Sequence, residues 1–149
     1  MAIWNGKGYY DSDLRKWLLN TFIDELPALL QERLVPVKRI TQVGALNWDE
    51  FDTYYDKLIV PTYRELGYGS ATGHPYCDEN NKPFPTFSSN AMRQIATYRG
   101  GDQNAALRVW AASTTTTNYN NFITIGLEGT NSSYGAYNLF AVLFGFCIK

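Results

Sequence analysis

Histidine, cysteine and long apolar runs are scarce in this chain, and each scarcity excludes a class of protein. His74 is the only histidine among 149 residues, so a Ser-His-Asp or Cys-His catalytic arrangement would depend entirely on it. The two cysteines, Cys77 and Cys147, are spaced unlike any zinc or redox motif. No segment reaches the roughly 18 apolar residues of a membrane span, and the first residues lack the apolar stretch of a signal peptide. We therefore expect no metal, no cofactor and no membrane insertion, and no export by the usual route.

Charge is also sparse and evenly spread. The formal net charge is −1, the pI is about 5.8, and Lys and Arg are scattered along the chain. Nucleic-acid-binding domains concentrate positive charge on one face, so we expect no nucleic-acid partner. At this length, folding buries about 68–70% of the surface that the unfolded chain exposes, which is enough for one core. Since no repeat or linker divides the chain, residues 1–149 are predicted to form a single domain.

The histidine and the cysteines have structural explanations beside their catalytic ones. His74 and Cys77 are close in the sequence, but sequence neighbours rarely have the geometry of a catalytic dyad, and no orienting acid is evident. We favour local loop packing for both. Cys147 lies in an apolar run, where the expected role is that of a small buried hydrophobe. Two idle thiols are favoured over a disulfide, since the missing export signal indicates a reducing place of synthesis.

Two amphipathic helices are predicted near the N-terminus. Ser12 is a good N-cap, and Asp13 stands in the first turn, where the helix dipole favours negative charge. The residues that follow place one apolar side toward the core: Leu14, Trp17, Leu18 and Phe22. A second helix is predicted from near Pro27 to Pro36, with its own apolar side: Leu26, Leu29, Leu30 and Leu34. We expect these helices to form a tight corner packed on a sheet.

Short strands and loops are predicted for the rest of the chain. In order, these are a partly exposed strand at 35–40, a loop at 44–55, a buried strand at 57–60 and one helical turn at 62–66 closed by Gly67. Residues 67–89 are rich in Gly and Pro, which predicts a long irregular loop. Three later strands are predicted at 106–112, 122–127 and 141–148, and the last closes the core. The predicted fold class is α+β.

Four acidic residues lie close together in or beside the predicted loop at 44–55: Asp49, Glu50, Asp52 and Asp56. Such a cluster suggests a calcium or glycosidase site. However, its spacing fits no EF-hand loop, and paired catalytic acids are recognised only by the distance between them. We favour a solvated loop anchored by its aromatic residues.

The last third of the chain is poor in charge and rich in Thr, Asn, Ser, Gly and Tyr. Tyrosine supplies large contact area at low entropic cost, and Asn, Ser and Gly supply adaptable hydrogen bonds, as in antibody binding loops. Such a surface suits a sugar, a protein or another subunit. The equally weighted alternative is a set of polar strand edges and loops whose Tyr rings cover the sheet. The candidate binding residues are Asn118, Tyr119, Asn120, Asn121, Asn131, Tyr134, Tyr137 and Asn138.

Four segments resemble one protein family in their order and spacing. They are 10–22, 56–67, 109–113 and 144–148. The family's patterns are, approximately, S-x-L-R-x-W-L-N, D-K-L-W-L-P-S-x-x-E, W-L-R-S and a final G-V-x-x-x-F-x-I. It is a domain of unknown function common in phage and prophage structural proteins and in some bacterial surface proteins. The agreement extends from about residue 9 to the end, so it is more specific than any single motif.

The resemblance implies a C-type-lectin-like fold of the formylglycine-generating-enzyme type, with two N-terminal helices packed on a small twisted antiparallel sheet with long loops. Similar proteins include variable receptor-binding proteins of phage, whose diversified side chains lie just before a fixed closing strand. The run at 113–138 resembles such a surface in composition and place. Two features depart from the family: Ala111 and Ala112 follow Trp110 in place of the leucine and arginine of W-L-R-S, and the usual opening strands are missing. A domain shortened in this way at its N-terminus is expected to rely on a neighbouring subunit.

Three functions compete on this basis. The first is a non-enzymatic virion protein, made in the bacterial cytoplasm, that serves as a head decoration, fibre or tail adhesion domain. It would assemble as a homo-oligomer, contact other virion proteins and bind a host-surface glycan or protein. The second is a carbohydrate- or protein-binding module of a bacterial surface protein, disfavoured by the missing export signal or anchor. The third is an oxidase of the formylglycine-generating type, disfavoured because its copper site needs two C-terminal cysteines and Cys147 is alone there.

Overall fold

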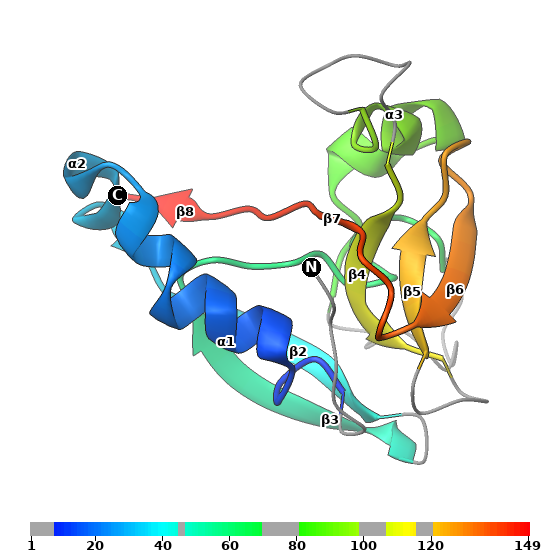
Figure 1. Ribbon diagram of the computed structural model, residues 1–149, viewed down its shortest axis with the longest axis horizontal. Coiled ribbons are helices and arrows are strands. Elements are labelled where there is room, and N and C mark those ends of the chain that lie inside the picture. The colour runs from blue at the N-terminus through cyan, green and yellow to red at the C-terminus, as the bar shows by residue number, and fades with distance from the viewer. Residues whose placement is uncertain (1–7, 45–46, 70–80, 99–106, 116–120) are drawn as a thin grey trace.

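The computed structural model describes residues 8–44, 47–69, 81–98, 107–115 and 121–149 (Figure 1). Its helical elements are α1 (Asp13–Asn20), η1 (Phe22–Glu25), α2 (Ala28–Gln31), η2 (Pro85–Phe87) and α3 (Asn90–Ile95), where η marks a 3₁₀ turn. Its strands are β1 (Leu34–Val35), β2 (Val37–Gly44), β3 (Asn47–Asp56), β4 (Val109–Thr114), β5 (Asn121–Ile125), β6 (Asn131–Gly135), β7 (Ala141–Val142) and β8 (Cys147–Ile148). The fold class is α+β, as predicted. None of the helices in the described ranges is both long and apolar enough to cross a membrane.

Helix α1 begins where the sequence predicts it. The Ser12 hydroxyl accepts a hydrogen bond from the Arg15 backbone N–H at 3.2 Å, which satisfies one of the free donors at the helix start. Leu14 and Leu18, one turn apart, are fully buried in the core. The N-cap and the apolar spacing were therefore sufficient to place this helix.

The second predicted helix is much shorter than expected. Helix α2 follows Pro27 but ends at Gln31, and η1 fills the connection to α1. Leu34 leaves the helix to enter β1, where it is buried and pairs with Ile148 near the end of the chain. The prediction of a helix up to Pro36 is therefore wrong. Leu34, the last leucine of the predicted apolar side, pairs in a strand and not in the helix.

Strands β2 and β3 form a long antiparallel hairpin in the region where a loop is predicted at 44–55. At the end of β3 the side chains alternate: Tyr54 and Asp56 are buried, whereas Thr53 and Tyr55 are exposed. The sequence did not predict this strand, because an acidic residue, Asp56, occupies an inward position that an apolar residue usually holds.

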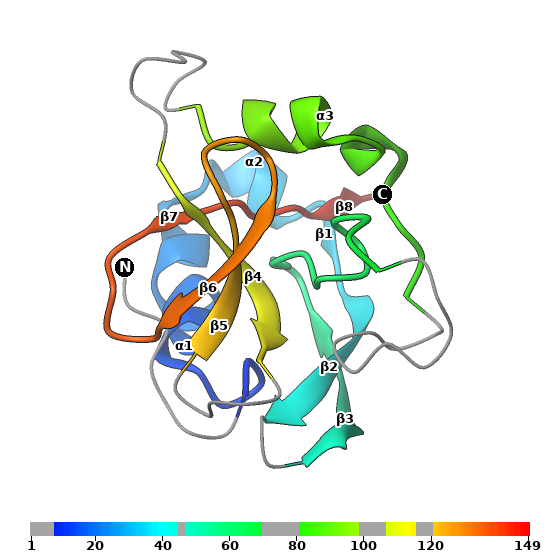
Figure 2. The same cartoon turned by 90° about the vertical axis from the view of Figure 1, so that its right-hand side faces the viewer.

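The central sheet has the strand order β6-β5-β4-β7 (Figure 2). Strand β4 is buried along its whole length, and its alternate side chains point to opposite faces. Trp110 and Ala112 enter one apolar core, which contains the inner side of α1, and Val109 and Ala111 enter a second core, beside the turn at 62–66 and η2. Because β7 runs parallel to β4, the sheet is mixed and not wholly antiparallel as expected.

The apolar run at 141–148 forms two short strands and not the single strand predicted. Strand β7 belongs to the central sheet, Gly145 then forms an antiparallel bridge with Ile59, and β8 pairs with β1. The segment predicted as a strand at 57–60 is buried from Leu58 to Val60 but pairs only through this bridge within the described residues. Cys147 is exposed, so its expected burial is wrong: β8 lies in a two-stranded sheet at the margin of the molecule (Figure 1).

Candidate functional site

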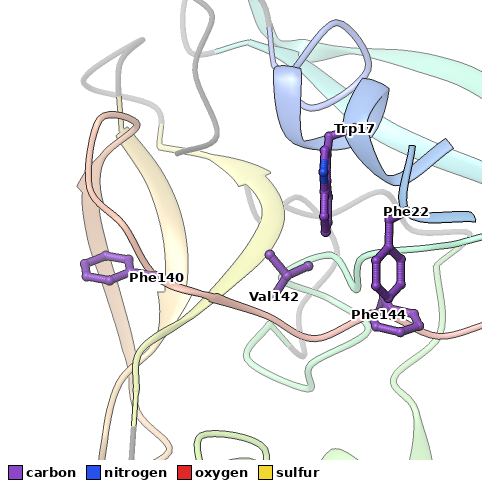
Figure 3. A pocket seen from close by; sticks show the side chains of 5 residues that line it. All are labelled: Trp17, Phe22, Phe140, Val142 and Phe144. Atoms are coloured by element: carbon purple, nitrogen blue, oxygen red, sulfur yellow. The ribbon is translucent and has the colours of Figure 1, made fainter. Parts of the chain in front are cut away.

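An open apolar groove lies between the α1–η1 side of the fold and the C-terminal segment. Its volume is about 500 Å³, and its lining side chains are Trp17, Phe22, Phe140, Val142 and Phe144. Figure 3 shows Trp17 and Phe22 extending from the helical side toward Val142 and Phe144. All five side chains are half-buried, and none is charged. Ligand sites in proteins have volumes of this order and walls that are mostly apolar and aromatic.

The aromatic rings of the groove hold one another in place. The Trp17 and Phe22 rings stack with centroids 5.0 Å apart and an interplanar angle of 30°. Phe22 in turn meets Phe144 edge-on at 4.9 Å. Aromatic pairs of this kind add about 0.5–1.5 kcal/mol beyond the burial of their area. The predicted core side of the first helix is thus divided: Leu14 and Leu18 reach the core, while Trp17 and Phe22 form a wall of the groove.

The groove continues into a surface that we call the tyrosine strip, made of Tyr134, Tyr137 and Leu139. Phe140 joins the two, because it lines the groove and also meets the Tyr134 ring edge-on at 5.1 Å. Tyr137 and Leu139 are 78% and 77% exposed. From residue 109 to residue 148 the sequence carries a single charged residue, Glu128. These exposed side chains suit the apolar face of a sugar or of a protein, and the Arg108 guanidinium lies 4.6 Å from the ring centroid of Tyr134 beside them.

The predicted Tyr/Asn surface falls partly on this strip. Tyr134 and Tyr137 belong to it, whereas Asn118, Tyr119 and Asn120 lie outside the described residues. The groove itself was not predicted, because its walls come from distant parts of the sequence, 17–22 and 140–144. The helical spacing of Trp17 and Phe22 did signal one wall, but that spacing alone does not separate a groove from a core.

Two asparagines of the predicted surface, Asn131 and Asn138, make side-chain hydrogen bonds within the fold. The Asn131 side chain donates a hydrogen bond to the Tyr63 hydroxyl at 2.9 Å, and the Asn138 side chain donates one to the Gly135 carbonyl at 2.9 Å. Asn121 is half-buried at the start of β5, where its carbonyl accepts a hydrogen bond from the Thr115 N–H at 3.0 Å. These contacts favour the structural interpretation for Asn131 and Asn138, and Tyr134 and Tyr137 remain candidates for binding.

Two ion pairs fix the elements that support the groove. The Arg15 guanidinium on α1 donates to both carboxylate oxygens of Asp56 at 2.8 and 2.7 Å, which ties two of the resembling segments together. Arg39 donates to both carboxylate oxygens of Glu65 at 2.5 and 2.6 Å and to the Val60 carbonyl at 3.1 Å. Bidentate, charge-assisted hydrogen bonds are among the strongest in proteins. These charges therefore have structural partners.

Tyrosines lie around the Arg15–Asp56 pair, and Tyr9 and Tyr54 among them are buried. The Arg15 guanidinium lies 4.6 and 4.5 Å from the ring centroids of Tyr10 and Tyr54. Burial is the main cause that raises the pKa of Tyr54 and the pKa of Tyr9 above the ordinary tyrosine value. Both hydroxyls consequently remain protonated at neutral pH, which makes neither a general base.

The predicted acidic cluster does not form a solvated loop. Asp56 is buried in its ion pair, and Asp52 is half-buried on the same strand, where burial and then the charge of Asp11 raise its pKa. In the part of the chain that the structure describes, no three His, Cys, Asp or Glu side chains come close enough to hold a metal ion. His74 and Cys77, the predicted but disfavoured dyad, lie outside the described residues.

Arg93 is a buried anchor that the sequence did not reveal. It lies on α3, a helix that was not predicted, although Ser89 caps it by accepting a hydrogen bond from the Met92 N–H at 3.3 Å. The Arg93 guanidinium donates to the carbonyls of Leu66 and Phe87 at 3.1 and 2.7 Å. A buried arginine without a carboxylate partner leaves no charge pattern in the sequence.

The turn between β5 and β6 is held against α3 through Gly129. Its carbonyl accepts hydrogen bonds from Arg93 at 3.0 Å and from the Tyr68 hydroxyl at 2.8 Å. Gly129 has a φ of +72°, and a side chain there would overlap the carbonyl oxygen of Asn90, so glycine is required. Burial raises the pKa of Tyr68 to about 12, which keeps its hydroxyl available as a donor. This anchor fixes the sheet edge next to the tyrosine strip.

Comparison with known proteins identifies a family and no activity. A family model described as a domain of unknown function (DUF6273) matches residues 2–149. No curated protein and no solved structure matches the chain. Since the match covers nearly the whole sequence, the chain belongs to the DUF6273 family.

Proposed function

We propose that this chain is a non-enzymatic structural protein of a phage virion. In this proposal it is a head decoration, fibre or tail adhesion domain that assembles as a homo-oligomer, contacts other virion proteins and binds a host-surface glycan or protein. The groove and the tyrosine strip form the binding surface. The observation that carries the proposal is the continuity of these two features through Phe140, which gives one largely aromatic surface.

The chemistry of the described charged residues supports a binding role. Arg15, Asp56, Arg39 and Glu65 are used in ion pairs, and Arg93 is used in backbone contacts. Aromatic rings offer stacking and apolar contact without requiring a charge on the ligand. A surface of this kind favours recognition of neutral sugars or apolar protein patches over acid–base chemistry.

The arrangement of the chain supports the C-type-lectin-like fold within this proposal. The resemblance implies a fixed closing strand after a variable surface, and here β7, Gly145 and β8 follow the strip and tie it to three different segments. A closing segment secured in this way tolerates variation in the residues before it. Solution of an experimental structure would test this assignment directly.

Mass spectrometry of purified virions tests the location of the protein. Particles released from the host that encodes the chain should contain its peptides at the abundance of known structural proteins. Abundant host cytoplasmic proteins serve as the contamination control. Absence from particles, or recovery with the cell envelope only, would contradict the virion assignment.

A glycan array and binding to host cells test the surface. Tyr137→Ala should lower binding by about tenfold or more, because exposed aromatic anchors carry much of the affinity of an interface. Tyr55→Ala is a matched control, since Tyr55 is also highly exposed, at 66%, but lies on β3. Equal binding by both variants and the unmodified protein would place the binding surface elsewhere.

A further inference from the structure

Strand β6 has an open edge. It is the terminal strand of the central sheet, and its five residues pair with β5 on one side without a register shift. Outside that pairing, no backbone group of Asn131–Tyr134 is hydrogen-bonded to another described residue. In Figure 1 this strand forms one margin of the molecule, and Figure 2 views the molecule from that side. Its outer N–H and C=O groups are therefore available to another strand.

This edge lacks the features that usually prevent strand addition. Proteins protect exposed edges with charged side chains, proline, bulges or very short strands. Strand β6 has the sequence Asn-Ser-Ser-Tyr-Gly, without charge, proline or bulge. By contrast, β2 and β3 carry charged residues, and β1, β7 and β8 have two residues each. Among the described strands that end a sheet, β6 is therefore the one suited to accept a partner strand.

We propose that β6 pairs antiparallel with β6 of a second copy of this chain, forming a two-fold dimer with one continuous eight-stranded sheet. This inference rests on the proposed homo-oligomer and assigns it a surface. Antiparallel pairing of a strand with itself is self-complementary, as a two-fold interface requires. With Ser133 of each copy at the axis, Asn131 faces Gly135 of the other copy, and Ser132 faces Tyr134.

The positions of the charged Glu128 and of the exposed Leu127 and Tyr137 are compatible with pairing to a second copy. Glu128, the charged residue nearest the strand in sequence, lies on the turn before β6, so the two-fold places the two Glu128 carboxylates at opposite ends of the pair. Like charges consequently do not meet. Antiparallel pairing also brings the end of one strand to the start of the other. Exposed Tyr137, which follows β6, then lies near the turn that carries Leu127, which is 42% exposed.

Sedimentation velocity over a range of protein concentrations tests the dimer. The unmodified protein should reach a mass twice that of the 16.9 kDa chain. Ser133→Lys should raise the dissociation constant about tenfold or more, because it sets two like charges face to face at the axis. Ser133 is exposed, so the folded monomer should accept lysine there, which circular dichroism checks.

Two control variants separate edge pairing from a general effect of charge. Thr53→Lys adds the same charge at an exposed position of β3 and should leave the dimer unchanged. Ser133→Thr adds no charge at the axis and should preserve the dimer. A monomer at every concentration would overturn both this interface and the homo-oligomer of the proposed function. A dimer that resists Ser133→Lys would overturn the interface alone. Slower amide exchange at residues 131–134 in the dimer would support it independently.

Discussion

The part of the chain before residue 69 and the part after residue 107 are stabilised in different ways. The first part places charged side chains inside the fold, where Arg15 meets Asp56 and Arg39 meets Glu65. The second part has almost no charge, and its strand β4 enters two apolar cores that it shares with residues of the first part. Buried ion pairs demand defined geometry, whereas an uncharged sheet leaves its outer side chains free for contacts. In the function that we propose, the first part is the frame and the second part provides the contact surface.

The largest loss of folding stability is expected when the Arg39–Glu65 ion pair of the first part is broken at Glu65. Glu65→Gln leaves the buried Arg39 guanidinium without a counter-charge and weakens the hydrogen bond to the Thr62 N–H, which is 2.8 Å in the native chain. Removing one partner of a buried ion pair costs about 3–5 kcal/mol. The free energy of unfolding, measured with urea, should fall by this amount.

A double substitution provides the control for Glu65. Arg39→Met with Glu65→Leu removes both charges and keeps similar volume, so it should be less destabilising than Glu65→Gln alone. A double variant at least as unstable as the single one would show that packing, and not the unpaired charge, determines the loss.

Parts of the fold were predictable wherever local signals and tertiary packing agreed. Helix α1 followed from its N-cap and apolar spacing, and the positive φ of Gly67, +74°, agrees with its predicted place at the end of a turn. The β2–β3 hairpin escaped prediction because Asp56 points inward to an arginine that is 41 positions away. The split of the C-terminal run depends on the bridge between Gly145 and Ile59, which no local pattern specifies.

The candidate site was predicted in part for the same physical reason. Composition identified Tyr134 and Tyr137, since tyrosine and the absence of charge are local features of the sequence. It did not separate them from Asn131 and Asn138, whose amides bond within the fold. The groove required two distant aromatic clusters to meet, so only a structure could show it.

An intermediate effect is expected at high pH, and it concerns three tyrosines of the first part, of which Tyr68 contacts the second part through the Gly129 carbonyl. Burial raises the pKa of Tyr68 from 10.0 to about 12, and it also raises those of Tyr9 and Tyr54. The folded protein thus retains protons that the unfolded chain has already lost. The stabilisation is complete below pH 10.0 and is lost as the pH rises through about 12.

Tyr68→Phe tests the share of this loss that comes from Tyr68, whose hydroxyl contacts the turn between β5 and β6. At neutral pH the variant should lose about 0.5–1.5 kcal/mol, because the hydrogen bond to the Gly129 carbonyl is missing. Between pH 10 and 12 its stability should decline less steeply than that of the unmodified protein. Urea unfolding at several pH values, with tyrosinate absorbance as a second readout, gives both slopes. Parallel slopes would assign the alkaline loss to Tyr9 and Tyr54.

The smallest effect on stability is expected at Tyr137, and it sharpens the distinction between frame and contact surface. Tyr137→Ala should change the free energy of unfolding by less than about 0.5 kcal/mol, since the side chain is 78% exposed. Tyr134→Ala should cost about 1 kcal/mol or more, because that ring meets Phe140 and lies 4.6 Å from the Arg108 guanidinium. Thermal and urea unfolding of both variants measure the difference. If Tyr137→Ala is as destabilising as Tyr134→Ala, the ring covers the sheet, and its exposure has a structural origin. If stability is retained while binding is lost, the fold does not need this ring, and contact with a ligand or another subunit is the remaining physical reason for a tyrosine at the surface.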